Sequence, residues 1–117
     1  MAVDATRFAI EWQAAWNARD LSRILSHYTE DVIFRSRKAM ALVGAGELRG
    51  KPALRHYWQR ALANQPDLHF TVKDVFAGHQ MMVVIYENQR GTLAAETLMF
   101  TADGLIWQAS ACHADIA

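Results

Sequence analysis

The sequence is poor in several residue types, and each scarcity excludes a class of protein. A single cysteine, Cys112, rules out a disulfide within the chain. Only two prolines and six glycines occur among 117 residues, of which 52% are hydrophobic, so a disordered chain is not expected. No apolar run approaches about 18 residues, the length that a membrane-spanning helix needs. These absences, with the lack of a secretory signal in MAVDATRF, predict one soluble cytoplasmic domain over residues 1–117.

An excess of charge of one sign is also missing. Twelve Lys and Arg balance twelve Asp and Glu, so the chain lacks the net positive field that gathers nucleic acid or an anionic membrane. We therefore predict neither as a partner. Basic residues do cluster around the segment 35–55, and we interpret them as a solvated rim that can attract an acidic ligand. They are Arg35, Arg37, Lys38, Arg49, Lys51 and Arg55.

Helical periodicity dominates the first half of the chain. Apolar residues recur at helical spacing over residues 4–18, and a shorter helix that begins after Asp20 has Tyr28 on its apolar face. Residues 31–37 are typical of a short strand, and residues 37–50, with three glycines, indicate a long loop. A third helix is predicted from Pro52 to residues 64–66.

Alternating side chains dominate the second half. Four strands are predicted over residues 68–78, 80–89, 92–100 and 105–113. Consecutive strands predict an antiparallel meander, and helices followed by strands indicate an α+β fold with the helices on one face of a curved sheet. Asp103-Gly104 favours a two-residue type I′ hairpin between the last two strands.

The register of this hairpin places one acid in an apolar face. Counting back from the turn pairs Phe100 with Trp107. The same register pairs Glu96 with Ala111 and brings His113 diagonal to Glu96. The other residues of the face are Ala94, Leu98, Phe100, Leu105, Trp107, Ala109 and Ala111. Because burial of an unpaired carboxyl group is costly and raises its pKa, Glu96 is predicted to line a pocket.

Each candidate residue also has a structural interpretation. Glu96 can instead bond a backbone group or an arginine, and His113 can replace a core aromatic residue. Tyr86 shares the face of Glu96 if the connection at Arg90-Gly91 has three residues, and lies on the opposite face if it has two. The candidate aromatic residues of the helices lie at core spacing, where packing is the commoner role.

No metal site and no cofactor are predicted. The sequence has no His-x-x-His or His-Glu-x-x-His pair, and Cys112 points away from His113 on its strand.

Three segments carry a resemblance to a known family: WQAAWNARDLSRILSHYTEDVIF, GELRGKPALRHYW and AAETLMFTADGLI. In this order they resemble the SnoaL-like branch of the NTF2-like superfamily, over nearly the whole chain. The resemblance implies a conical barrel in which a strongly curved, mostly antiparallel sheet wraps around three helices of the N-terminal half and encloses a pocket. Members include ketosteroid isomerases, polyketide cyclases, epoxide hydrolases and domains that bind or dimerise without catalysis.

The ketosteroid isomerase pattern matches this chain only in part. The position of its catalytic aspartate falls on Ser36, and that of its oxyanion-hole tyrosine falls on Trp12. Its second oxyanion-hole donor, a protonated aspartate, falls on Glu96. Steroid isomerisation by that mechanism is therefore not expected. The resemblance places these residues around the pocket: Trp12, Trp16, Tyr28, Phe34, Tyr57, Trp58, Tyr86 and His113.

Three functions are compatible with the sequence. The first is an isomerase, cyclase or hydrolase in which Glu96 is general acid or base toward a small hydrophobic carbonyl or polycyclic compound, and His113 tunes or relays its proton. The second is a protein that binds a hydrophobic molecule without converting it, which Ser36 and Trp12 favour. The third is a homodimer formed through the convex outer face of the sheet. Its interface residues would be Met81, Val83, Ile85, Ala95, Thr97 and Met99.

Overall fold

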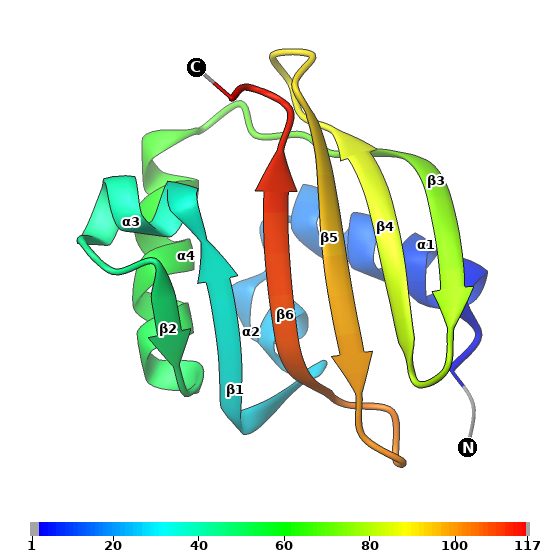
Figure 1. Ribbon diagram of the computed structural model, residues 1–117. Coiled ribbons are helices and arrows are strands. Elements are labelled where there is room, and N and C mark those ends of the chain that lie inside the picture. The colour runs from blue at the N-terminus through cyan, green and yellow to red at the C-terminus, as the bar shows by residue number, and fades with distance from the viewer. Residues whose placement is uncertain (1–2, 117) are drawn as a thin grey trace.

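The computed structural model describes residues 3–116, which form a six-stranded sheet and four helices (Figure 1). The elements are α1 (Ala5–Asn17), α2 (Leu21–Leu25), β1 (Tyr28–Ser36), α3 (Arg37–Val43), β2 (Glu47–Arg49), α4 (Lys51–Asn64), β3 (Thr71–Gly78), β4 (Met81–Glu87), β5 (Leu93–Phe100) and β6 (Ile106–His113). The strand order is β2-β1-β6-β5-β4-β3. The expected α+β architecture is confirmed.

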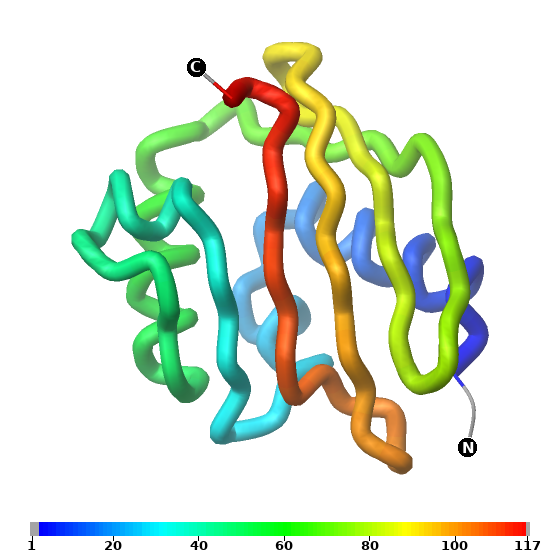
Figure 2. The backbone as a smooth tube through the Cα atoms, in the orientation of Figure 1, coloured from blue at the N-terminus to red at the C-terminus, as the bar shows by residue number. Residues whose placement is uncertain are grey.

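The sheet is antiparallel except where β1 and β6 run parallel. Strands β3 to β6 follow one another as neighbours, which confirms the predicted meander. Helices α1, α2 and α4 lie behind the sheet in Figure 1, and the smooth trace in Figure 2 shows the strands curving over them. The core therefore lies between one face of the sheet and the helices.

Helices α1 and α4 each present one aromatic face to this core. Asp4 caps α1 by accepting a hydrogen bond from the Arg7 backbone N–H at 3.0 Å. Gly50 precedes α4, and Pro52 occupies its first turn, where a missing N–H does no harm. The two faces meet at Trp16 and Trp58, whose ring centroids are 5.0 Å apart.

The long loop predicted for residues 37–50 is wrong, because this segment contains α3 and β2. The Ser36 hydroxyl caps α3 by accepting hydrogen bonds from the backbone N–H groups of Lys38 and Ala39. Gly44, with φ at +80°, ends the helix in the left-handed conformation. The glycines that suggested a loop thus lie between short elements: Gly44 ends α3, Gly46 precedes β2 and Gly50 precedes α4.

The second helix is shorter than predicted, and Tyr28 does not belong to it. Helix α2 ends at Leu25, and Tyr28 begins β1, where it pairs with Ile106 of β6. The Ile106 backbone N–H donates to the His27 carbonyl at 2.8 Å. Pairing with a strand from the other end of the chain overrides the local helical spacing.

The connection between β5 and β6 also differs from the predicted two-residue turn. It spans residues 101–105, and the Thr101 hydroxyl accepts from the Leu105 backbone N–H at 3.1 Å. A register shift follows, so that Phe100 pairs with Ile106 instead of Trp107. Trp107 consequently leaves the inner face and is 41% exposed. Beyond this irregularity the predicted register holds, and Glu96 pairs with Ala111.

In the part of the chain that the structure describes, no helix combines the length and the apolar composition needed to cross a membrane.

Candidate functional site

A cavity of about 100 Å³ opens where β1 and β6 end, beside the hairpin that joins β4 to β5 and the end of α4. Aromatic side chains form most of its wall, and polar side chains lie among them. The aromatic lining residues are Trp16, Phe34, Tyr57, Trp58, Phe70 and Tyr86. The polar and charged lining residues are Ser36, Lys38, Gln65, Asn88, Arg90, Glu96 and His113.

Glu96 lies inside this cavity and is only 5% exposed. It sits on β5, with Val84 on one neighbouring strand and Ala111 on the other. Within residues 3–116 its carboxyl group has no hydrogen bond and no ion pair. Burial alone raises the pKa of Glu96 to about 8. At neutral pH the group is therefore mainly protonated and can donate a hydrogen bond or a proton.

His113 lines the same cavity from β6, where it pairs with Ala94. It is diagonal to Glu96, as the sequence predicts, but no hydrogen bond joins the two side chains. The Nδ1 atom of His113 is buried and has no partner among the described residues. Burial lowers the pKa of His113, and the charge of Lys38 lowers it further, while Asp115 opposes the shift. The ring is consequently neutral at pH 7.

Tyr86 faces the cavity because of the length of the hairpin before β5. The connection spans residues 88–92, so Tyr86 pairs with Ala94 on the face of Glu96. The sequence leaves two orientations of Tyr86 open. This connection has five residues, an odd number like the three-residue alternative, so Tyr86 shares the face of Glu96. Burial raises the pKa of Tyr86 well above its ordinary value, and the charge of Glu96 adds to the effect. Tyr57 shows a smaller rise with the same principal cause.

Two of the predicted ligand-binding residues, Trp12 and Tyr28, lie behind the cavity wall and not in it. Trp12 stacks on Phe70, with ring centroids 5.6 Å apart, and Tyr28 packs against Trp58 at 5.3 Å. The Nε1 atom of Trp16, which lines the cavity, is buried without a partner among the described residues. This donor makes the wall more polar than its hydrocarbon surface suggests.

Sequence reasoning missed Phe70 as a lining residue. Its backbone N–H donates to Asn17 Oδ1 at 2.8 Å, and its carbonyl accepts from Asn17 Nδ2 at 2.9 Å. This pairing of a helix end with a segment 53 residues later holds the ring against the cavity. No local pattern signals it.

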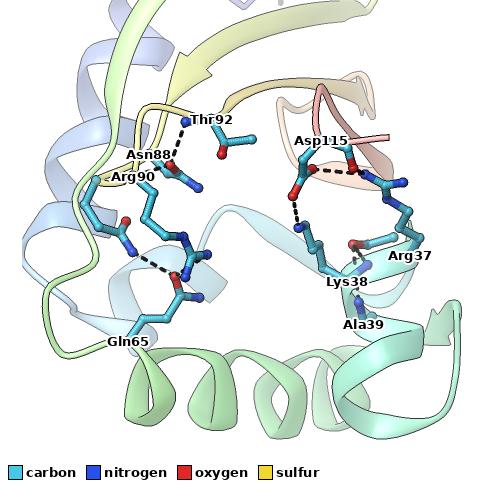
Figure 3. Close-up of polar contacts among 10 residues, drawn as sticks. Arg37, Lys38, Ala39, Gln65, Asn88, Arg90, Thr92 and Asp115 are labelled. Carbon is cyan, nitrogen blue, oxygen red and sulfur yellow. Dashed lines mark hydrogen bonds and ion pairs between the residues drawn. The ribbon is translucent and has the colours of Figure 1, made fainter. Parts of the chain in front are cut away.

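The mouth of the cavity is polar on two sides (Figure 3). On one side, Lys38 Nζ lies 2.5 Å from Asp115 Oδ2, and Arg37 pairs with the same carboxylate at 3.0 Å. On the other, Arg90 donates to Gln65 Oε1 at 3.3 Å. Asn88 shapes this side because its Oδ1 accepts from the backbone N–H groups of Arg90 and Thr92. Lys38 belongs to the basic rim that the sequence predicts, whereas Arg90 was not predicted at the pocket.

A family model for the SnoaL-like domain matches residues 9–109. The chain belongs to the SnoaL-like domain family. It is 37% identical to a SnoaL-like protein of unknown function from Burkholderia thailandensis, whose crystal structure superposes with a TM-score of 0.90 over 97% of this chain and 99% of that one. The resemblance that the sequence carries is thereby confirmed.

More distant solved structures share the fold of this SnoaL-like protein. An NTF2-like protein of unknown function from Burkholderia pseudomallei is 14% identical, with a TM-score of 0.76 over 95% of this chain and 91% of that one. The epoxide hydrolase/cyclase-like enzyme SalBIII of salinomycin pyran ring formation is 16% identical, with a TM-score of 0.73 over 94% and 90% of the two chains. A search of curated protein sequences found no match.

Two further features of this SnoaL-like chain help to define the site. A larger hollow of about 310 Å³ lies between the N-terminal segment and the β3–β4 hairpin, but its one titratable lining residue, His79, is exposed. Among the described residues, no group of three or more His, Cys, Asp and Glu side chains is placed to hold a metal ion. The buried titratable groups therefore single out the cavity around Glu96.

Proposed function

We propose that this SnoaL-like protein catalyses proton transfer on a small hydrophobic carbonyl compound, with protonated Glu96 as the general acid. One observation carries the proposal: Glu96 is a carboxyl group that is 5% exposed, unpaired within residues 3–116 and in contact with a cavity. A group that gives up a proton near neutral pH is most effective when its pKa is close to that pH. The raised pKa of Glu96 meets this condition.

His113 is the complementary base in this proposal. The pKa of Glu96 is raised and that of His113 is lowered, so the acid is protonated and the base is neutral in the same pH range. The backbones of diagonal residues on neighbouring strands are roughly 7–8 Å apart, and both side chains line the same cavity, so both can contact one substrate there. Ala94 and Ala111, small residues beside the two groups, line this space.

The proposed step is enolisation. His113 removes a proton from the carbon next to the carbonyl group, and the electron pair of that C–H bond forms the C=C bond of the enol. Glu96 transfers its proton to the carbonyl oxygen. The reverse step returns a proton to carbon and another to Glu96. An isomerase or a cyclase needs such an enol as intermediate, so the step is common to several of the activities that the sequence allows.

The cavity limits the size of the reacting group. A volume of about 100 Å³ is smaller than the roughly 150 Å³ engineered cavity that binds benzene, so a single small ring is the largest group expected inside. We therefore propose that a reacting ring enters and that any remainder of a larger compound stays at the mouth. The phenols of Tyr57 and Tyr86 are neutral at pH 7, since burial raises pKa values that ordinarily already lie near 10, and they can orient this ring.

Exchange of the α-protons of cyclohexanone in deuterated water, followed by NMR, tests the proposal. We expect exchange above the buffer rate, with a loss of at least about 100-fold in Glu96→Gln and in His113→Gln, the scale of general acid–base catalysis. Glu30→Gln, whose side chain is 87% exposed, is the matched control and should exchange like the parent protein. Equal rates in the parent and in Glu96→Gln would refute the role of Glu96.

Binding without conversion is the second candidate function, and Ser36 favours it. This residue stands where ketosteroid isomerases carry the catalytic aspartate, yet here its hydroxyl caps α3. Native mass spectrometry of the protein purified from untreated cells separates the two functions. The compound is incubated with the protein in deuterated water and then released: an unaltered mass and NMR spectrum support binding alone, whereas uptake of deuterium or a rearranged structure supports catalysis.

Dimerisation through the outer face of the sheet completes the proposal and is compatible with either function. Cross-strand pairs on this face are Met81 with Met99, Val83 with Thr97, and Ile85 with Ala95. All six residues are partly exposed in the single chain. Their contiguity supports an isologous two-fold contact in which the same patch meets itself.

A further inference from the structure

The charges that line the cavity are of one sign. Lys38 and Arg90 are its cationic lining residues, and Glu96 is the one acid among them. Because Glu96 is mainly protonated at neutral pH, no ionised carboxylate occurs among the described residues that line the cavity. A chain with no net charge overall therefore concentrates positive charge at this opening.

The two cations are incompletely neutralised by their neighbours. Asp115 is shared between Lys38 and Arg37, so one carboxylate faces two positive charges. Arg90 has a neutral partner, the Gln65 amide oxygen at 3.3 Å, and makes no ion pair within residues 3–116. Figure 3 shows Lys38 and Arg90 in two separate groups of side chains, with the Lys38 ammonium directed toward Asp115 and the Arg90 guanidinium toward Gln65.

The interior beyond these cations is suited to a ring. Trp16, Trp58 and Phe70 supply flat apolar surface, and the Nε1 atom of Trp16 is a buried donor without a partner among the described residues. A molecule that satisfies both regions has an uncharged ring at one end and an anionic group at the other. The small volume of the cavity, about 100 Å³, requires the two ends of such a molecule to lie close together.

We propose that the ligand of this site is a single-ring organic carboxylate, with its ring in the cavity and its carboxylate at the mouth between Lys38 and Arg90. The inference rests on the proposed function for the identity of the cavity as the active site, and it adds the chemical class of the substrate. A guanidinium group matches a carboxylate with two parallel hydrogen bonds, whereas an ammonium group acts as a point charge. Arg90 is therefore the specificity-determining residue and Lys38 contributes attraction.

Isothermal titration calorimetry at neutral pH with benzoate and with benzyl alcohol, its neutral analogue, tests the proposal. We expect benzoate to bind the parent protein at least about tenfold more tightly than benzyl alcohol. Arg90→Gln and Lys38→Gln should each remove most of this preference, and Arg90→Lys should retain part of it. Arg7→Gln, which removes an exposed cation of α1 with the same change in net charge, should bind benzoate like the parent.

The outcomes separate this inference from the proposed function. Equal affinity for the two compounds, or a preference for benzoate that Arg90→Gln leaves intact, overturns the carboxylate site even if cyclohexanone exchange proceeds. Failure of both compounds to bind overturns it as well. Charge-dependent benzoate binding without any exchange in the first assay supports the site and contradicts catalysis. Denaturation midpoints of the variants show that each of them is folded.

Discussion

At the scale of the residue, the protein tolerates an expensive arrangement at Glu96. A buried polar group without a partner ordinarily costs 1–3 kcal/mol, so such groups are rare unless a ligand or a function explains them. Here the carboxyl group shares the cavity with two more buried polar atoms that have no partner among the described residues, Nε1 of Trp16 and Nδ1 of His113. Concentrating this cost beside a cavity is the pattern expected of a functional site.

The same residue predicts a pH dependence of stability. The pKa of Glu96 is about 8 in the folded protein against 4.5 in the unfolded chain, so the unfolded chain binds fewer protons between these values. The free energy of unfolding should therefore fall as pH rises from about 4.5 to about 8, by about 4 kcal/mol for this group. Urea denaturation at pH values across this range measures the slope.

The contribution of Glu96 is isolated by comparing how the free energy of unfolding depends on pH in the parent protein and in its variants. Glu96→Gln should lack the fall, because its side chain does not titrate, and the difference from the parent should grow toward pH 8. Glu30→Gln, at a site where the side chain is 87% exposed, should follow the parent. Parallel curves for the parent and Glu96→Gln would show that the group ionises normally in the folded protein.

At the scale of the element, the β4–β5 hairpin decides which residues reach the cavity. Its five residues put Tyr86 on the inner face and Arg90 at the mouth. Asn88 closes the turn through two side-chain hydrogen bonds, and the Gly91 backbone N–H donates to the Asn88 carbonyl at 3.0 Å. Gly91 adopts φ +81°, a conformation that residues with a side chain rarely adopt.

Two Gly→Ala substitutions should therefore differ in their effect on the stability of the protein. Gly91→Ala places a Cβ in open space, so its cost is conformational alone, about 1–2 kcal/mol. Gly46→Ala meets Met40 Cβ at 3.6 Å, an ordinary contact at an ordinary φ, and should be neutral or stabilising through the unfolded chain. Thermal denaturation of the two variants measures the contrast. A stable Gly91→Ala would show that the hairpin adopts another turn.

At the scale of the whole molecule, the two faces of the sheet differ in their side chains and in what covers them. The inner face, with the helices behind it, carries Glu96 and the cavity. The outer face of β4 and β5 carries partly exposed apolar residues in cross-strand register. Leu93 and Trp107, at 43% and 41% exposure, extend the apolar surface of these strands and of β6. Such a surface is typical of an interface between subunits.

Analytical ultracentrifugation tests the proposed dimer. The parent protein should sediment as a dimer at micromolar concentration, and Val83→Lys should sediment as a monomer because it places a charge in the centre of the patch. Ile10→Lys is the control, since Ile10 is 68% exposed on α1, in the other layer of the molecule. A monomeric parent protein would contradict the proposal.

The sequence by itself determined the class of the fold and the face on which Glu96 lies. Both depend on alternation and helical spacing, which are local properties, and the pairing of Glu96 with Ala111 survives the misjudged turn because the irregularity is confined to the end of the strand pair. The resemblance to the SnoaL-like family could also be recognised from the sequence, because the family pattern consists of the same local segments.

Only the tertiary structure decided which residues surround the acid. The family resemblance places Trp12 and Tyr28 around the pocket, yet Phe70 and Trp58 pack against them and line the cavity. Phe70 owes its place to Asn17, and Arg90 to a turn whose length alternation does not specify. Contacts between distant segments and the lengths of connections depend on the packing of the complete chain, so they set the shape and the charge of the cavity.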